Sequence, residues 1–321
     1  MSTQAIVTPV KSTFTGIGQV MFQQSCWTGL LFFAGIVWGS YENHLPQVAW
    51  GALVGAIVST AAGYLLQPKS QDGPDGLYGF NGTLVGCAFP TFLANTWLMW
   101  LALVVCAAIT AWVRTGFNNV MSTWKGNVNS LTFPFVFMTW IFLYSSRMMN
   151  GIHTFDGGLS TPELTTDFIY HLDTSFGDLV IYWLKGISQV FLINSWVTGI
   201  FFLVALAVCS RWACMWAAVA SAVSLAIAIL FQANPHDIIN GLFGFSPVLT
   251  GIAVGCTFYK PCLKTALWTL TAIIATVFVQ AGMDSFFAPY GLPTLTGPFC
   301  ITTWLFLLPA FDLNPKTAKA S

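Results

Sequence analysis

A succession of apolar runs, separated by short polar connections, constrains the fold of this chain more than any other feature. A helix needs about 20 apolar residues to cross a membrane, and several runs approach that length. These runs are 27–40, 48–67, 97–113, 131–146, 196–209, 212–232, 265–280 and 299–310. Charged residues make up only 7% of the chain, whereas soluble proteins carry about 25%. The sequence therefore predicts an all-α integral membrane protein.

Two further apolar segments, 81–93 and 246–259, are short for a complete crossing. Non-spanning pieces of this kind are tolerated inside a membrane only where they are buried in protein or line a cavity. They are therefore candidates for half-spanning or re-entrant elements. The alternative, that the run boundaries are misplaced by a few residues, stays open at this point.

The chain repeats itself. Residues 76–86 and 241–251 share six of eleven amino acids at an offset of 241 − 76 = 165. Residues 131–143 and 295–307 share eight of thirteen at an offset of 164, and a third related block begins at Ile17 and Ile187. Blocks in the same order at a nearly constant offset indicate an internal duplication. We expect a first transmembrane repeat over 1–148, a polar linker over 149–179 and a second transmembrane repeat over 180–321.

The charges suggest an orientation. The linker carries four acids and no Lys or Arg, whereas the ends of the chain carry Lys11, Lys316 and Lys319. Because short cytoplasmic loops are enriched in Lys and Arg, we expect cytoplasmic termini and an external linker. Each half then crosses the membrane an odd number of times, so the second repeat is inverted relative to the first, as in many transporters.

A glutamine recurs near the start of each repeat, as Gln19 and Gln189. Its amide offers an acceptor and two donors without a charge, so in a pore it could accept an N–H from a neutral amide solute. The alternative is a glutamine at the headgroup level that satisfies a helix end. The recurrence in both halves favours the pore.

A phenylalanine and a leucine four residues apart also recur, as Phe80 with Leu84 and Phe245 with Leu249. On a helix each pair shares one face. A glycine directly precedes each phenylalanine and is expected to allow a tight turn before a helix begins. The aromatic ring could form a slot wall, with the leucine narrowing the path one turn deeper. Ordinary core packing is the alternative.

The third recurring feature is Leu-Thr-x-Pro-Phe, which contains Thr132 and Thr296. Proline favours the first turn of a helix and threonine is a competent N-cap, so a helix is expected to begin at each motif. The hydroxyl could line a pore, cap its helix, or do both.

The residues that catalysis, metal binding or ion coupling would need are not found in the apolar runs. The apolar runs contain no acid–base pair, because the charged residues lie near run ends and the four histidines fall in polar connections. No nucleophile with a base, metal cluster or phosphate loop is recognisable. The zero net charge gives no indication of nucleic acid. We therefore expect no enzyme, no metal, no cofactor and no ion-coupled pump, and a small neutral solute that moves downhill.

The two blocks at 76–86 and 241–249, the segment from Gly18 to Phe22 and both Leu-Thr-x-Pro-Phe motifs resemble the urea transporter family. The resemblance covers nearly the whole chain. It implies a homotrimer in the cell membrane with one narrow urea pore per subunit. It also implies two inverted repeats, each with about five transmembrane helices and a re-entrant or tilted pore helix.

The resemblance also implies roles for particular residues. One urea-binding end consists of Gln19, Phe22 and Phe80, and the other of Gln189 and Phe245. The constricted middle is lined by Leu84, Thr132, Val190, Leu249 and Thr296. The position that matches Phe22 in the second repeat is Leu192, so the neighbouring Phe191 is a candidate for the second aromatic wall.

A channel for another small neutral solute, such as water, ammonia or a small amide, is the alternative function. A water channel of the aquaporin type would carry two Asn-Pro-Ala motifs, and this chain has none. An ammonium channel would place histidines deep in the pore, whereas these histidines fall in polar connections.

Overall fold

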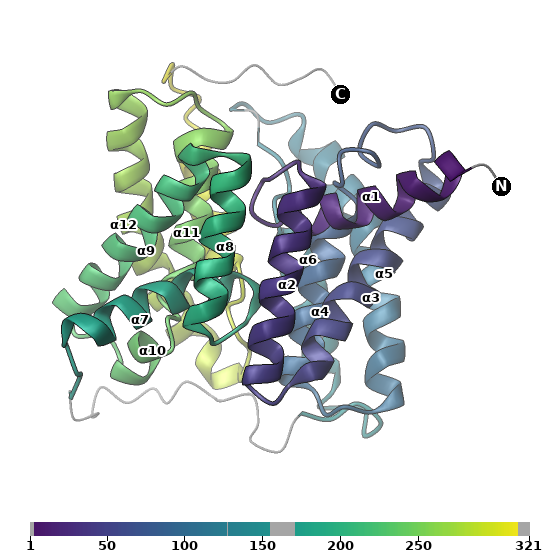
Figure 1. Ribbon diagram of the computed structural model, residues 1–321, viewed down its shortest axis with the longest axis horizontal. Helices are drawn as coiled ribbons and strands as arrows, with labels where there is room; N and C mark the ends of the chain where they lie inside the picture. Colours follow the sequence, from purple (N-terminus) through teal and green to yellow (C-terminus); the bar gives the residue numbers. More distant parts are fainter. Residues whose placement is uncertain (1–2, 127, 155–170, 314–321) are drawn as a thin grey trace. The chain divides into compact units, whose positions relative to one another are not determined.

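The computed structural model describes residues 3–126, 128–154 and 171–313. Within these residues the chain is helical and contains no β-strand, which confirms the predicted all-α class (Figure 1). The expected orientation rests partly on Lys316 and Lys319 and on linker residues 155–170, which lie outside the described part.

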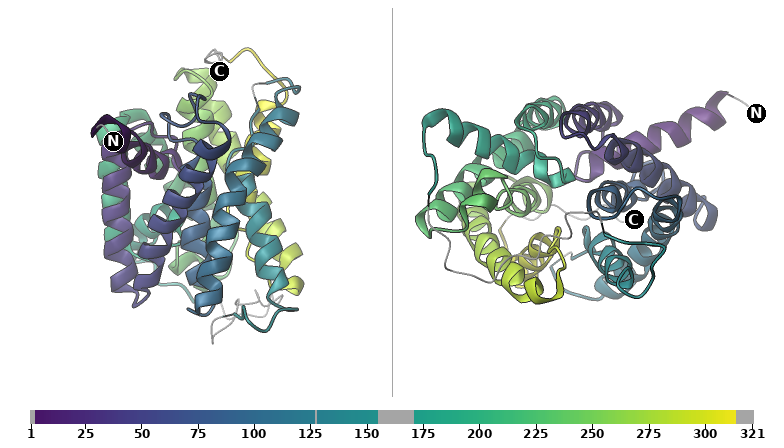
Figure 2. Two further views of the ribbon diagram at one scale, coloured as in Figure 1. Left: turned by 90° about the vertical axis from the view of Figure 1, so that its right-hand side faces the viewer. Right: turned by 90° about the horizontal axis from the view of Figure 1, so that it is seen from below.

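The described residues form two compact units. The first unit contains 3–123 and 129–154, and the second contains 124–126, 128 and 171–313. Figure 2 shows their helices in two further views, with the first unit in purple to blue and the second largely in teal to yellow.

Six helices make up the first unit. They are α1 (Thr3–Gln19), α2 (Cys26–Glu42), α3 (Pro46–Leu66), α4 (Gly79–Phe92), α5 (Trp97–Met121) and α6 (Phe133–Ser145). The helices of the second unit are α7 (Phe176–Ser188), η1 (Gln189–Phe191), α8 (Trp196–Cys209), α9 (Arg211–Leu230), α10 (Pro235–Ile239), α11 (Phe245–Ile252), η2 (Ala253–Thr257), α12 (Leu263–Phe287), η3 (Ala288–Tyr290) and α13 (Gly297–Leu307).

The same local devices recur in the same order in both units. Ser25 and Ser195 are the N-caps of α2 and α8, and each side chain accepts a hydrogen bond from the backbone N–H three residues later. The backbone turns through positive φ at Gly76 and at Gly241, with φ of 77° and 72°. Each of these glycines precedes a buried helix, α4 or α11.

Within the part of the chain that the structure describes, four helical segments are long and apolar enough to cross a membrane: Pro46–Leu66, Trp97–Met121, Arg211–Leu230 and Leu263–Tyr290. A fifth crossing is possible if Phe176–Phe191 and Trp196–Cys209, which are bent by 72°, form one span. The shorter apolar helices are Phe133–Ser145, Phe245–Thr257 and Gly297–Leu307. These helices agree with the prediction of a multi-pass membrane protein, and the number of crossings in each half stays a prediction.

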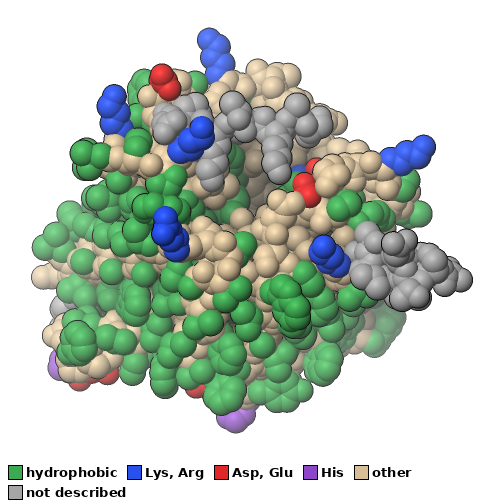
Figure 3. Space-filling view, turned by 45° about the horizontal axis from the view of Figure 1, so that its top comes forward, with side chains coloured by type: hydrophobic (Ala, Val, Ile, Leu, Met, Phe, Trp, Pro, Cys, Tyr) green, Lys and Arg blue, Asp and Glu red, His purple; other side chains and the backbone are tan. Residues whose placement is uncertain are grey.

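Large hydrophobic side chains are exposed on these helices, as expected for surfaces that face lipid. Trp27, Trp97 and Leu263 each have at least 70% of their surface exposed. Figure 3 shows one face of the molecule, on which hydrophobic side chains predominate and charged side chains are few. A soluble protein rarely exposes so much contiguous apolar surface.

Helix α4 is the most enclosed helix of the first unit, because every residue from Gly79 to Pro90 is buried. It packs mainly along α3, and glycines line the contact. A Cβ added to Gly86 would collide with the carbonyl oxygen of Gly51, and one added to Gly82 would collide with Ser59 and Gly55. Small residues let two backbones approach closely, which favours helix association inside a membrane.

This packing predicts that Gly86→Ala lowers the thermal stability of the detergent-solubilised protein. Overpacking of this kind costs about 1–3 kcal/mol, because the neighbouring atoms belong to a backbone that cannot rotate away. Gly116→Ala in α5 is the matched control, since nothing lies within 4 Å of its added Cβ; it should stabilise its helix by about 0.5–1 kcal/mol. Thermal unfolding in detergent measures both changes, and equal melting temperatures for the two variants would contradict the close contact.

Candidate functional site

The first recurring glutamine, Gln19, is the last residue of α1 and is half-buried. Its Nε2 donates a hydrogen bond of 2.8 Å to the carbonyl oxygen of Asp75, in the connection that leads to α4. Helices α1 and α4 cross closely at Gly16 and Gly79, as shown by the 2.9 Å that would separate a Cβ added to Gly16 from the Cα of Gly79. The structure therefore brings Gln19 together with the start of the helix that carries Phe80 and Leu84.

The second unit repeats this arrangement. Gln189 follows α7 directly, and its Nε2 donates a hydrogen bond of 2.8 Å to the carbonyl oxygen of Asn240. A Cβ on Gly186 would lie 3.1 Å from the Cα of Gly244, directly before Phe245. Asp75 and Asn240 each precede the positive-φ glycine of their unit.

These hydrogen bonds determine which donor and acceptor atoms of each glutamine side chain remain available to a solute. A primary amide has two N–H donors on nitrogen and one carbonyl acceptor. Nε2 is held by a backbone carbonyl in both units, which fixes the orientation of the side chain. Among the described residues no hydrogen bond to Oε1 of Gln19 or Gln189 is formed, so each Oε1 is available to accept.

The expected Phe–Leu helices are present. Phe80 and Leu84 lie in α4 with 8% and 0% of their surface exposed. In α11, Phe245 is half-buried and Leu249 is fully buried. Each pair therefore occupies one helix face, four residues apart.

The role expected for the preceding glycines is wrong. The tight turn falls at Gly76 and Gly241, whereas Gly79 and Gly244 have ordinary helical or near-helical backbones. Gly79 and Gly244 are instead needed for space, because an added Cβ would meet Thr60 of α3 or Gly186 of α7. The repeated glycine reflects a close crossing of two helices.

The candidates for the aromatic wall differ between the two units. Phe22 and Leu192 both adopt left-handed backbone conformations, with φ of 62° and 58°, and both are half-buried, so they occupy matching positions. Phe191 is fully buried and packs edge-on against Phe202 of α8, with ring centroids 5.0 Å apart. Val190 is also buried, at 1% exposure. Phe191 thus contributes to the core of the second unit.

The Leu-Thr-x-Pro-Phe motifs begin helices as predicted. Thr132 and Thr296 stand at the N-cap positions of α6 and α13, and both are 3% exposed. Neither side chain makes a capping hydrogen bond, so of the alternatives left open for the hydroxyl, the capping one is not supported. In the first unit a different side chain serves the new helix: the N–H of Phe135 donates to Oδ1 of Asn81 in α4, at 3.1 Å.

A buried ion pair was missed at the sequence level. Arg114 lies inside α5 rather than beyond its end, and its side chain is only 8% exposed. Its Nη1 lies 2.7 Å from Oδ2 of Asp72, in the connection between α3 and α4. The available signal was an arginine within a long helix of otherwise apolar residues, where an unpaired charge is expensive.

The matching acid of the second unit, Asp237 in α10, has a different environment. It lies beside His236, with 3.4 Å between Nδ1 and Oδ1. Burial raises the pKa of the Asp237 carboxyl, and the neighbouring histidine opposes that shift. No cluster of three potential metal ligands occurs among the described side chains.

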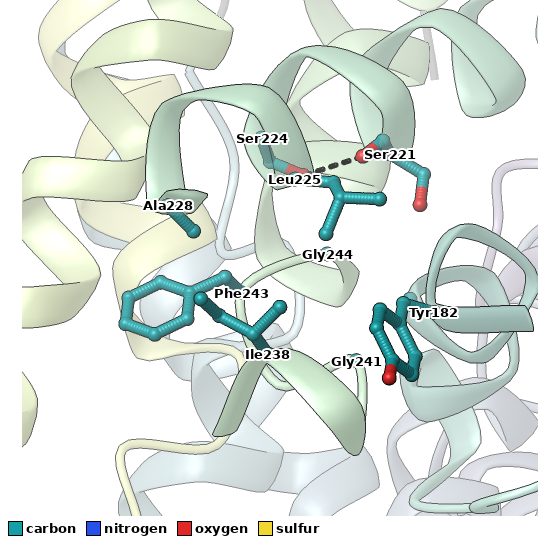
Figure 4. A pocket seen from close by; sticks show the side chains of 10 residues that line it. Tyr182, Ser221, Ser224, Leu225, Ala228, Ile238, Gly241, Phe243 and Gly244 are labelled. Carbon is teal, nitrogen blue, oxygen red and sulfur yellow. Dashed lines mark hydrogen bonds between the residues drawn. The ribbon is translucent and has the colours of Figure 1, made fainter. Parts of the chain in front are cut away.

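A small cavity lies within the second unit, between α7, α9, α10 and the turn before α11 (Figure 4). Its volume of about 10 Å³ is room for roughly one water molecule. The hydroxyls of Ser221 and Ser224 in its wall donate to the carbonyl oxygens of Trp183 and Ser221. Urea is much larger than this space, so the cavity is a packing feature.

Comparison with known proteins identifies the family. The sequence profile of the family described as "Urea transporter" matches residues 10–311. The chain is 31% identical to urea transporter 1 of Ovis aries over 308 residues, which cover 95% of this chain and 77% of that protein. It is 30% identical to urea transporter 1 of Rattus norvegicus over 299 residues, which cover 91% of this chain and 75% of that protein. The chain therefore belongs to the urea transporter family, a family of membrane transport proteins and not of enzymes.

Proposed function

We propose that this chain is a channel that conducts urea passively, down its gradient, through a narrow pore in each subunit. Family membership supports urea transport. The channel proposal rests mainly on one observation: two glutamines, one in each unit, are oriented by the same hydrogen bond and keep an uncharged acceptor free. Such groups can bind a neutral amide and release it without a proton or an ion.

The chemistry of urea suits these groups. Urea is flat and neutral, with four N–H donors and one carbonyl acceptor. Transfer of an unpaired amide from water to an apolar environment costs about 2–7 kcal/mol, and the two Oε1 atoms can recover part of that cost. Aromatic rings suit a flat molecule, because their faces accept weak N–H contacts. Conduction requires binding strong enough for entry and weak enough for exit.

We assign the residues in two groups. Gln19, Phe22 and Phe80 form the urea-binding end of the first unit, and Gln189 and Phe245 form that of the second. The lining of the narrow middle is assigned to Leu84, Thr132, Val190, Leu249 and Thr296. Phe191 is the least favoured of the original candidates, because it already packs against Phe202.

The remaining features of the proposal follow from the sequence and its resemblance. They are a homotrimer in the cell membrane, cytoplasmic termini and an inverted second repeat. The domain boundaries proposed are 1–148, 149–179 and 180–321, although α7 begins at Phe176, within the segment expected to be linker.

The first prediction is that proteoliposomes containing the full chain take up urea faster than empty liposomes in stopped-flow measurements. The initial rate should not change with a sodium or proton gradient, because no charge moves with the solute. A strong gradient effect would indicate coupled transport. Acceleration of water or ammonia without acceleration of urea would favour the alternative neutral solute.

A second prediction concerns the glutamines. Gln19→Leu and Gln189→Leu each remove the acceptor and leave a urea N–H without a partner, which costs about 1–3 kcal/mol. We expect urea flux per folded protein to fall about tenfold for each variant, since 1.4 kcal/mol corresponds to a factor of ten.

Gln47→Leu is the matched control for these variants, because Gln47 is also partly buried but lies at the start of α3. It should keep the original flux. Size-exclusion profiles should show that all three variants assemble. Normal flux in both site variants would refute the assigned ends.

A further inference from the structure

The residue that orients Gln189 is itself held by a side chain outside the proposed urea-binding end. Oδ1 of Asn240 accepts a hydrogen bond of 2.8 Å from Nδ2 of Asn194. The carbonyl oxygen of the same Asn240 accepts from Nε2 of Gln189 at 2.8 Å. Two amides that are five positions apart in the chain therefore bind one residue, the first through its backbone and the second through its side chain.

The first unit contains the same pair of contacts. Oδ1 of Asp75 accepts from Nε2 of Gln24 at 2.5 Å, and its carbonyl oxygen accepts from Nε2 of Gln19. Gln24 and Asn194 occupy matching positions, because each directly precedes the N-cap serine of the next helix, α2 or α8. The residue held in this way is an acid in the first unit and an amide in the second. The contact therefore recurs whether or not its acceptor is charged.

The other hydrogen bonds of Asn240 tie it to its own helix, α10. Its Nδ2 donates to the carbonyl oxygen of His236 at 2.9 Å and lies 3.1 Å from the ring Nε2 of that histidine. Its backbone N–H donates to the same carbonyl oxygen at 3.2 Å. The bond from Asn194 instead links Asn240 to the segment that follows Gln189. It fixes the carbonyl of Asn240 relative to the glutamine that binds it.

Asn194 has a cost that stability alone does not explain. Its own Oδ1 is buried and has no hydrogen-bond partner among the described residues. An unpaired buried amide oxygen is unfavourable, and an apolar side chain at this position would avoid that cost. What the asparagine supplies in return is the Nδ2 donor to Asn240.

This donor matters for Gln189 because hydrogen bonds are directional. The bond from Nε2 to the Asn240 carbonyl sets the plane of the Gln189 amide and hence the direction of its Oε1. A shift of the Asn240 carbonyl would turn that acceptor away. Binding groups keep a productive geometry only when supporting hydrogen bonds hold them in place.

We propose that Asn194 is a positioning residue of the second urea-binding end. By holding Asn240, it keeps the Gln189 amide oriented so that Oε1 can accept an N–H of urea. Asn194 itself does not contact urea. Gln24 has the corresponding place in the first unit, where its side chain is exposed and water can replace its donor. This inference rests on the proposed urea channel and its assigned ends.

The test is a double-mutant cycle, measured as stopped-flow urea uptake per folded protein by the full chain in proteoliposomes. Asn194→Leu keeps a similar size and removes the donor. We expect the flux to fall about fivefold, which corresponds to roughly 1 kcal/mol. In a chain that already carries Gln189→Leu, the same substitution should leave the flux unchanged, because residues that act as one unit are not additive. A further fivefold loss in that background, or normal flux in the single variant, would overturn the proposal.

Asn95→Leu is the matched control. Asn95 directly precedes Thr96, the N-cap of α5, and its Oδ1 accepts from Nε1 of Trp100 at 2.9 Å. The substitution removes a side-chain hydrogen bond at an equivalent place outside the proposed ends, so its flux should equal that of the original chain. A fivefold loss here would overturn the specific role of Asn194. If Asn194→Leu does not assemble, Asn194→Ala replaces it in both backgrounds, with the same expected and opposing results.

The outcomes also separate this inference from the function on which it rests. Absence of urea flux in the original chain would refute the channel itself. Urea flux in the original chain and a loss in Gln189→Leu, followed by a further loss when Asn194→Leu is added, would refute only the positioning role.

Discussion

The crossing between the first helix of each unit and the buried Phe–Leu helix is the contact on which the candidate site depends. Gly16 approaches Gly79 in one unit, and Gly186 approaches Gly244 in the other. Since no Cβ intervenes, a glutamine one turn further along the first helix reaches the carbonyl before the next turn. A larger residue at these glycines would separate the helices and break that hydrogen bond. Backbone proximity therefore comes first, and the orientation of the polar groups follows from it.

The two units share this backbone plan and differ in how they hold it. The turn before the Phe–Leu helix is held by the Arg114–Asp72 ion pair in the first unit. In the second unit it is held by Gln280 of α12, whose Nε2 donates to the carbonyl oxygen of Leu242. Helices α5 and α12 both have 25 residues and begin at Trp97 and Leu263, so Arg114 and Gln280 occupy the same helix position. A buried ion pair offers little net stability over an uncharged solution, so stability is a weak reason to keep it.

The features that the sequence predicted depend on local chemistry. Apolar run length predicts membrane helices, proline after Leu-Thr predicts the starts of α6 and α13, and repeated spacing places Phe80 and Leu84 on one face. The features that it missed depend on contacts between distant residues. Arg114 and Asp72 are separated by 42 positions, and no periodicity connects them. The function of Gly79 was misjudged for the same reason, since it depends on which helix packs beside it.

Duplication adds a constraint that neither unit has alone. When two units share a backbone arrangement, the residues that are identical in both are those that the arrangement requires. Residues that differ are not required by the backbone arrangement alone. The amide of Gln19 and Gln189 belongs to the first group, because both are held by the same type of bond at 2.8 Å. Arg114 and Gln280 belong to the second, because both support the same turn with different charges. The two units therefore keep the same uncharged amide at the end of the first helix, while the side chains that hold the following turn differ in charge.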